Sequence, residues 1–379
     1  MKLLYLTPTY NSYSEVWQQR HIEMLSEYIS FIATVSPNEN KWRDKIPVID
    51  LNPERLLSTK IIKTIAKNTN NDLKINKHVQ KLINQVDTVF IQYLTFAVKF
   101  VDIINSSNKP TFIHCHGFDV TWDFRSHENP NVPKHDENYV KRVLSFNKNV
   151  FFIANSKNTI QKLKKIGVKD SQIKLKYLGT EITNINPKNE PNKEVNILYL
   201  GRLVDFKGPD MVIESFNIAC EKGIDSNLLI AGDGQLRVTC EIMKRKSKFA
   251  DKIQILGAVN KLKADELRQS ADIFIAQNCT GLLSKQEEAF GVSIIEAMAN
   301  GIPVITGRSG GVQETVIHNE TGLLNEPYNI EEQAKNIIYL CENLDIAKKM
   351  GEAGRKRVEE LFSFDIEKEN FLKILMGNK

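Results

Sequence analysis

Short apolar runs rich in Ile, Val, Leu and Phe alternate along the chain with longer amphipathic stretches. The apolar runs predict buried strands and the stretches between them predict helices, so the chain is expected to form β-α units with parallel sheets. The expected strands fall into two sets. The first set is 3–6, 31–35, 88–93, 111–116, 151–155 and 173–178, and the second is 195–200, 228–232, 253–256, 273–276 and 303–306.

A polar segment rich in Asn and Pro, residues 183–194, separates the two sets and has no periodicity. We interpret it as a linker between two doubly wound α/β domains, residues 1–185 and 186–362. The remaining residues, 363–379, predict a helix capped by Ser363 that could return to the first domain. In sheets of this kind a ligand is expected at the carboxyl ends of the strands, here between the domains.

The composition excludes several classes of protein. Apolar residues make up 41% and charged residues 26%, as in ordinary globular proteins, and no apolar run has the roughly 18 residues of a transmembrane helix. The apolar start is too short for a secretory signal, so we expect a first strand there. The five cysteines are scattered and form no C-x-x-C pair, which favours reduced thiols in a cytoplasm over disulfides or a zinc site.

The net charge of +5 is unevenly distributed. Residues 1–190 hold 27 Lys and Arg against 18 Asp and Glu, whereas the rest holds 24 against 28. Much of the excess lies in residues 60–81, whose lysines recur at near-helical spacing. This stretch is either a solvated helix face or a surface that meets anionic lipid headgroups or a phosphate-bearing acceptor. A nucleic-acid partner is not expected.

The strongest chemical signal is the segment EAFGVSIIEAMANGIPVI, which holds Glu288 and Glu296 on either side of Phe290 and Gly291. If a helix begins near Gly291, the first amides, that of Val292 among them, and the positive helix end can hold an anionic diphosphate. The two carboxylates could then accept hydrogen bonds from sugar hydroxyls. By its spacing alone, the segment could also be an ordinary loop, helix and strand with acids placed by chance.

This segment resembles the E-x(7)-E signature of GT4-type retaining glycosyltransferases, which have the GT-B fold of two facing Rossmann-like domains. Upstream, YLGRLVDFKG is similar to the family's G-R-L…K-G element and carries Gly201, Arg202 and Lys207. Downstream, residues 309–324 are similar to its G-G-x-x-E…G-x-T-G-L-L element. The resemblance covers nearly all of the second domain.

In the first domain, HCHGFDV resembles the family's H-G-x-D segment through His116, Gly117 and Asp119. The opening lacks a Gly-rich first loop, and its Ser14–Glu15 pair is similar to the S-E-T-F opening of exopolysaccharide and colanic-acid-type transferases. His116 by itself could be a structural histidine at a strand end. Asp119 is more typical of a turn or a helix cap than of catalysis.

Charge and resemblance together suggest a role for each residue. Breaking a sugar-phosphate bond leaves negative charge on the diphosphate, and Arg202 and Lys207 are the fixed cations that could stabilise it. The resemblance implies that Glu296 holds the nucleotide ribose, that Glu288 contacts the donor sugar, and that His116 lies by the reacting centre. The expected binding residues for the nucleotide are Gly201, Phe290, Gly291, Val292 and Glu296.

We therefore expect a retaining hexosyltransferase that moves a sugar from a nucleotide-diphosphate sugar to a saccharide or lipid-linked hydroxyl acceptor, in bacterial surface polysaccharide synthesis. It is expected in the cytoplasm, with a peripheral contact to the inner face of the cell membrane. No D-x-D string occurs, so the reaction should need no metal, and no cofactor is expected beyond the sugar nucleotide as co-substrate.

Two alternatives remain open at this stage. A catalytically silent sugar-nucleotide-binding protein would share the same motifs. A nucleotide-dependent oxidoreductase would need a complete G-x-G-x-x-G with an acid about 20 residues further on, and neither half supplies it. The AGDG string at 231–234 lacks that spacing and is interpreted as a tight turn.

Overall fold

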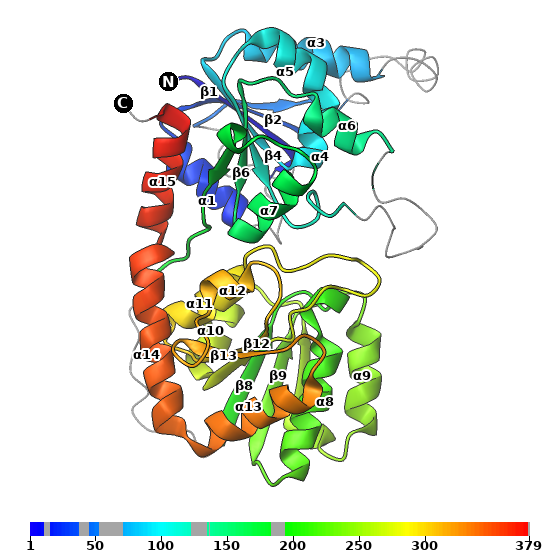
Figure 1. Ribbon diagram of the computed structural model, residues 1–379, viewed down its shortest axis with the longest axis vertical. Helices are drawn as coiled ribbons and strands as arrows, with labels where there is room; N and C mark the ends of the chain where they lie inside the picture. Colours follow the sequence, from blue (N-terminus) through cyan, green and yellow to red (C-terminus); the bar gives the residue numbers. More distant parts are fainter. Residues whose placement is uncertain are drawn as a thin grey trace.

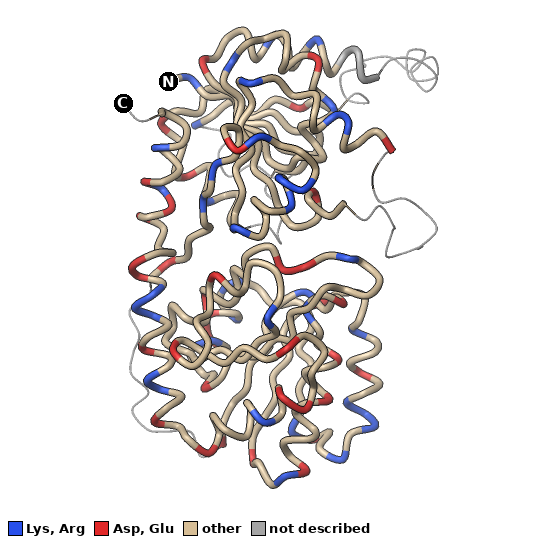
Figure 2. The backbone as a smooth tube through the Cα atoms, in the orientation of Figure 1, with Lys and Arg blue, Asp and Glu red and all other residues tan. Residues whose placement is uncertain are grey.

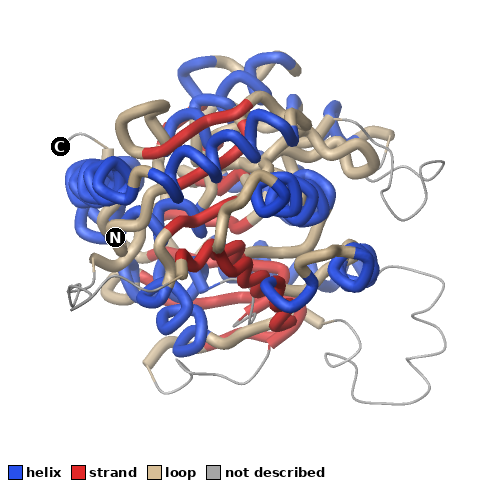
Figure 3. Tube along the Cα trace, turned by 90° about the horizontal axis from the view of Figure 1, so that it is seen from below, coloured by secondary structure: helices blue, strands red, loops and turns tan. Residues whose placement is uncertain are grey.

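The computed structural model describes residues 1–10, 16–37, 45–52, 71–122, 135, 137–182 and 194–377. Within these ranges the chain forms two parallel sheets, each covered by helices on both faces (Figures 1 and 3). This confirms the two doubly wound α/β layers that the alternation of apolar and amphipathic stretches predicted. Three parts of the sequence-based predictions fall outside the described residues: 183–193 of the linker, the Ser14–Glu15 pair, and 60–70 of the basic stretch 60–81.

The first sheet has seven strands in the order β3-β2-β1-β4-β5-β6-β7. Its strands are β1 (Leu3–Tyr10), β2 (Ile29–Pro37), β3 (Val48–Asp50), β4 (Thr88–Gln92), β5 (Thr111–Cys115), β6 (Val150–Ala154) and β7 (Ile173–Leu175). Its helices are α1 (Val16–Leu25), α3 (Asn71–Ile83), α4 (Leu94–Ala97), α5 (Val101–Ser107), α6 (Tyr139–Leu144) and α7 (Lys157–Lys165).

The second sheet has six strands in the order β10-β9-β8-β11-β12-β13. Its strands are β8 (Val195–Leu200), β9 (Ser226–Ala231), β10 (Ile253–Gly257), β11 (Ile273–Ile275), β12 (Val304–Gly307) and β13 (Gly322–Asn325). The helices are α8 (Pro209–Glu221), α9 (Arg237–Lys246), α10 (Lys261–Ser270), α11 (Val292–Ala299), α12 (Val312–Thr315), α13 (Ile330–Glu342), α14 (Leu344–Leu361) and α15 (Phe364–Met376).

Strand β1 supplies apolar side chains to both faces of the first sheet. Leu4 and Leu6 belong to one apolar core, whereas Leu3 and Tyr5 belong to the core on the opposite face, as the two-residue period of a strand requires. Phe371 of α15 is fully buried in that second core. Because full burial of such a side chain contributes roughly 1.5–3 kcal/mol, this helix is firmly attached to the first domain.

The last two helices divide between the domains. Figure 1 shows α14 along the second domain and α15 along the first, next to α1. At the crossing, the Thr180 amide donates to the Phe362 carbonyl (2.8 Å) and the Phe364 amide donates to the Thr180 carbonyl (3.1 Å). The Ser363 side chain accepts from the Ile366 amide and caps α15, as predicted.

Two expectations from composition concern the whole chain. None of the helices in the described ranges combines the length and the apolar character that crossing a membrane requires. All five cysteines lie in the described part and none forms a disulfide. Burial raises the pKa of the Cys115 thiol well above its ordinary value, so this thiol stays protonated.

Candidate active site

The second domain brings its motif residues together at one end of its sheet. Strand β8 lies between β9 and β11, the point at which the strand order reverses and where such sheets bind ligands. Gly201, Arg202 and Lys207 follow β8 directly, and Glu288 lies on the loop that leads from β11 to α11. The two motifs therefore meet because neighbouring parallel strands end at the same edge.

Lys207 and Glu288 form an ion pair, with Nζ 2.6 Å from Oε2. A Cβ placed on Gly201 would lie 3.7 Å from the same Nζ, so the glycine leaves room beside the ammonium. Burial by itself raises the pKa of the Glu288 carboxyl, but Lys207 and, to a smaller degree, Arg202 outweigh it, and the pKa falls below its ordinary value. Glu288 is thus an ionised acid, with Arg202 exposed nearby.

Helix α11 begins as its sequence predicts. Gly291 is the N-cap with φ 92°, a left-handed conformation that favours glycine. The first helical hydrogen bonds run from the Ile294 and Ile295 amides to the Gly291 carbonyl, so the amide of Val292 precedes them. These amides and the positive helix end suit an anionic ligand.

Phe290 has a different environment from its neighbours. Its side chain is buried and stacks on Tyr177 with ring centroids 5.5 Å apart, and it also contacts the Phe362 ring. The ring therefore belongs to the apolar cluster where the chain crosses between domains. Only the backbone of Phe290 remains for contact with a ligand.

Two arginines that the sequence did not suggest bind Glu296. Arg268 of α10 forms an ion pair with Glu296 through Nη2, and its Nη1 also donates to Asp265 at 2.8 Å. Arg20 of α1, in the first domain, reaches Glu296 with Nη2 3.6 Å from Oε1. Arg20 also lies over the Phe364 ring at 4.4 Å from its centroid. No spacing in the sequence links these arginines to the second acid, because each pairing forms only in the folded chain.

His116 lies on the first-domain side, directly after β5. Its ring packs against both Trp17 and Tyr93, with centroids 4.4 Å and 4.5 Å away. Burial, followed by His21 and Lys176, keeps the pKa of His116 well below 6.5, so the ring is neutral near neutral pH.

Asp119 has the structural role expected from its position in a turn. Its Oδ1 accepts from the His116 amide at 2.6 Å, and its Oδ2 accepts from the Leu94 amide at 2.8 Å, at the start of α4. Burial raises the pKa of the Asp119 carboxyl to about 7, although four backbone hydrogen bonds lower it. The carboxyl therefore fixes the loop that carries His116.

The two halves of the site are in contact. A Cβ placed on Gly117, next to His116, would lie 3.3 Å from the Ala289 Cβ and from the Glu287 carbonyl. Lys162 of α7 bridges the domains through Glu287, with Nζ 2.9 Å from Oε2. Figure 2 shows basic positions on this side of the first domain facing acidic positions on the second. The histidine thus lies opposite the loop that holds Glu288.

The sequence motif after β12 supports this loop. The Gly311 amide donates to the Glu288 carbonyl at 2.8 Å, and a Cβ on Gly310 would lie 2.2 Å from that carbonyl. Only glycine fits such an approach. The downstream S-G-G element therefore holds the backbone of the first acid.

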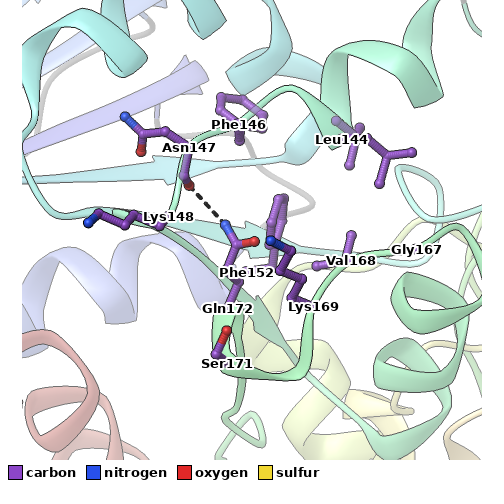
Figure 4. Close-up of a pocket in the computed structure, with 11 residues that line it drawn as sticks. Leu144, Phe146, Asn147, Lys148, Phe152, Gly167, Val168, Lys169, Ser171 and Gln172 are labelled. Atoms are coloured by element: carbon purple, nitrogen blue, oxygen red, sulfur yellow. Dashed lines mark hydrogen bonds between the residues drawn. The ribbon is translucent and has the colours of Figure 1, made fainter.

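A cavity of about 370 Å³ lies elsewhere in the first domain (Figure 4). It lies at the amino ends of β6 and β7, where the Gln172 side chain donates to the Asn147 and Val150 carbonyls, both at 2.9 Å. The motif residues lie at the carboxyl ends of their strands. The cavity is therefore separate from the site described above. Across the described ranges, no group of three or more His, Cys, Asp or Glu side chains is arranged to hold a metal ion.

The sequence profile of the family described as "Glycosyl transferases group 1" matches residues 181–357. The second domain belongs to this glycosyltransferase family. The match confirms the resemblance to GT4-type glycosyltransferases. It covers the glycosyltransferase domain that carries Gly201, Arg202, Lys207, Glu288 and Glu296.

Relatives of the glycosyltransferase domain include two mannosyltransferases. The GDP-mannose-dependent alpha-(1-6)-phosphatidylinositol monomannoside mannosyltransferase of Mycobacterium tuberculosis is 31% identical over 45% of this chain and 44% of its own length. The GDP-mannose-dependent monoacylated alpha-(1-6)-phosphatidylinositol monomannoside mannosyltransferase of Corynebacterium glutamicum is 33% identical over 52% of this chain and 55% of its own length. The chain thus spans about half the length of the curated relatives it matches.

The fold is similar over the whole chain to that of solved glycosyltransferase structures. A crystal structure of HepE from Anabaena in complex with UDP and glucose covers 100% of both chains with a TM-score of 0.77, at 16% identity. Such a likeness establishes the GT-B fold for both domains.

Proposed function

We propose that this protein is a retaining glycosyltransferase that transfers a hexose from a nucleoside diphosphate sugar to a hydroxyl acceptor without a metal ion. One observation carries the proposal. The group 1 domain presents Lys207, ionised Glu288 and the start of α11 at the end of its sheet, directly opposite His116 of the first domain. Neither a binding module nor an oxidoreductase requires a neutral histidine facing this loop.

The charges suit the departure of a diphosphate. When the bond between sugar and phosphate breaks, negative charge grows on the leaving oxygen, and cations fixed beforehand stabilise that state. Lys207 and Arg202 supply the cations, and the start of α11 supplies amides. Glu288 pairs with Lys207 in the structure, so a diphosphate that binds here competes with this acid for the ammonium. Glu288 is then free to accept hydrogen bonds from the sugar.

A lipid-linked acceptor in surface polysaccharide synthesis remains part of the proposal. Leu282 and Leu283 are exposed by 66% and 57% on the loop that leads to Glu288. The Asp205 carboxylate accepts from the Leu283 and Ser284 amides at 3.0 Å and 2.8 Å and so holds this loop in place. An apolar surface beside the site suits an acceptor with a lipid part. Contact of the basic first domain with an anionic membrane at the inner face of the cell stays a prediction.

The reaction itself provides the test. Incubation with candidate UDP-, GDP- and ADP-sugars and acceptors should yield a product whose anomeric configuration, read by NMR, equals that of the donor. Activity should survive EDTA, because Lys207, Arg202 and the helix start supply the positive charge. An inverted product, or activity lost to EDTA and restored by Mg²⁺ or Mn²⁺, would contradict the proposal. Donor binding without transfer or hydrolysis would instead indicate a silent sugar-nucleotide-binding protein.

The two acids should give different kinetic signatures. Glu296→Gln is expected mainly to raise the donor KM, since a ribose contact is similar in the ground and transition states. Glu288→Gln is expected mainly to lower kcat, by about 10²-fold, because the reacting carbon is misplaced. Steady-state kinetics with varied donor measure both. Glu352→Gln, on the exposed face of α14, is the control and should match the wild type. An unchanged kcat for Glu288→Gln would contradict the assignment of the first acid.

A further inference from the structure

A chain of buried polar side chains connects the last helix with His116. It consists of Glu367, Lys176, His21 and Gln92, each at most 4% exposed, and ends at His116. We refer to these five residues as the histidine relay. They come from α15, the end of β7, α1, β4 and the residue after β5. The proposed mechanism uses His116 but gives no role to the other four residues of the relay.

The relay begins at a carboxylate that is ionised. Burial by itself raises the pKa of Glu367, but the Lys176 ammonium, in contact with Oε1, outweighs it and holds this pKa well below its ordinary value. The Gly179 amide donates to Oε2 at 2.8 Å. An ionised carboxylate can only accept hydrogen bonds. Nε2 of His21 lies 2.9 Å from Oε1 and 3.1 Å from Nζ of Lys176, so it can either donate to the carboxylate or accept from the ammonium. Because the ammonium already has Oε1 as its acceptor, we assign Nε2 of His21 as a donor to the same oxygen.

This donation determines the tautomer of His21 and the orientation of the next amide. Burial, followed by Lys176, lowers the pKa of His21 to about 4, so its ring is neutral and carries one proton. With that proton on Nε2, Nδ1 must accept. The group 2.9 Å from Nδ1 is therefore the amide nitrogen of Gln92, and the same nitrogen donates to the Tyr5 hydroxyl at 2.7 Å. The amide oxygen of Gln92 must then face the opposite way.

The amide oxygen of Gln92 faces two more histidines. It lies 3.2 Å from Nε2 of His116 and 3.2 Å from Nδ1 of His114. Since a carbonyl oxygen only accepts, both ring nitrogens are protonated. Nε2 of His114 is buried and, among the described residues, has no partner, which suits a neutral ring. Within the described part of the chain, no hydrogen bond uses Nδ1 of His116.

We propose that Glu367 is a positioning residue that acts through His21 and Gln92 to hold His116 as the neutral tautomer with its proton on Nε2. Nδ1 of His116 then accepts a hydrogen bond from a hydroxyl of the donor sugar. This role in the reaction rests on the proposed glycosyl transfer, whereas the tautomer itself does not.

The groups around His116 agree with a neutral acceptor. The His114 and His21 rings, and the Lys176 ammonium beyond them, lie on its buried side, while the Asp119 carboxyl binds its backbone amide and not its ring. The remaining neighbours, Trp17 and Tyr93, are aromatic. No carboxylate among the described residues contacts the ring, so nothing there favours a second proton on it.

Glu367→Gln is expected to exchange the hydrogen-bond donors and acceptors along the relay, while the side chain keeps its size and shape. Without the carboxylate, the buried Lys176 loses the partner that raises its pKa, so it tends to lose its charge and no longer needs an oxygen at the position of Oε1. The Gly179 amide still needs an oxygen as acceptor, so the new amide nitrogen faces His21 and donates to its Nε2. His21 then carries its proton on Nδ1, the Gln92 amide turns over, and its nitrogen donates to Nε2 of His116. The proton of His116 is thereby moved to Nδ1.

The measurement is long-range ¹H–¹⁵N NMR of the full chain labelled with ¹⁵N in its seven histidines, with His116 assigned through His116→Asn. In the wild type we expect a protonated Nε2 and an unprotonated Nδ1, and in Glu367→Gln the reverse. Glu369→Gln makes the same change on the exposed face of α15, in a surface pair with Lys373, and should leave the tautomer unchanged. A wild-type proton on Nδ1, or the same tautomer in Glu367→Gln, would overturn the relay.

A second variant covers the case in which Glu367→Gln does not fold. Gln92→Glu places a carboxylate against His21 and His116, which favours the charged form of both rings. NMR titration should show both pKa values raised above those of the wild type, and unchanged values would overturn the relay.

Kinetics separate the two proposals. Glu367→Gln should lower kcat for sugar transfer about tenfold and leave the donor KM unchanged, because Nδ1 becomes a donor where an acceptor is needed. An unchanged kcat despite a reversed tautomer would overturn the role of Nδ1. The expected tautomers in a protein that transfers no sugar would refute the proposed function and leave the relay standing.

Discussion

Lys207→Ala is expected to lower kcat/KM for sugar transfer by about 10²- to 10³-fold, the scale for losing one fixed partner of a developing charge. The loss should be large because Lys207 acts twice. In the proposed reaction its ammonium contacts the diphosphate, and in the structure it keeps the largely buried Glu288 ionised through a 2.6 Å contact. Without it, burial raises the pKa of Glu288 and the acid tends to take up a proton.

Arg202→Ala should lower kcat/KM on the same scale, although Arg202 is exposed and contributes less to the ionisation of Glu288. The matched control is Lys222→Ala, which removes a half-exposed cation at the C-cap of α8. Among the described residues, Lys222 forms one ion pair, with Glu331 at 3.9 Å. The measurements are kcat/KM and calorimetric affinity for the nucleoside diphosphate. If a folded Lys207→Ala protein turned over like the wild type, the diphosphate would have to bind elsewhere.

Acid should destabilise the first domain steeply. His21, His114 and His116 all have pKa values below 6.5 in the folded chain, His21 at about 4. Their folded pKa values are lowered, so unfolding takes up protons, and stability present above pH 6.5 is lost as the pH falls. Asp119 offsets the proton uptake on unfolding by one proton. Its pKa is about 7 in the folded chain and 3.8 in the unfolded chain, so between these pH values its carboxyl releases a proton on unfolding. The net uptake is about two protons, or roughly 2.7 kcal/mol per pH unit between about pH 6 and 5.

Urea unfolding at a series of pH values, followed by tryptophan fluorescence, measures this slope. His114→Asn keeps a side-chain donor for Gln92 but removes one titrating ring, so the slope should fall by about one proton, or roughly 1.4 kcal/mol per pH unit. The control is His78→Gln on α3, because His78 is exposed. A free energy of unfolding that is flat between pH 6 and 5 would contradict the buried neutral histidines.

Much of the fold followed from local patterns. All eleven predicted strands exist, because a buried strand needs only a short apolar run that the sequence displays directly. β3 and β13 were missed. They have three and four residues and lie at the edges of their sheets, where pairing with a neighbour and not composition defines the strand. The strand expected over 88–93 ends at Gln92, because Tyr93 has a positive φ of 69°.

The candidate site was predictable only in part. The rule that parallel strands end at one edge was enough to place Arg202 and Lys207 near Glu288. The sequence did not reveal that Lys207 pairs with Glu288, and it assigned the two residues to different parts of the donor. It also gave Phe290 a place at the nucleotide, whereas its ring is buried against Tyr177.

The sequence by itself determined the two doubly wound domains, the start of α11 and the motif of the glycosyltransferase domain, because periodicity, capping and loop spacing act between residues close in the chain. Only the tertiary structure decided which charges pair. Arg268 meets Glu296 from 28 positions away, and His21 meets Glu367 from 346 positions away. Such contacts leave no local pattern, because their energy depends on burial and on a geometry that exists only once the sheets and helices have packed.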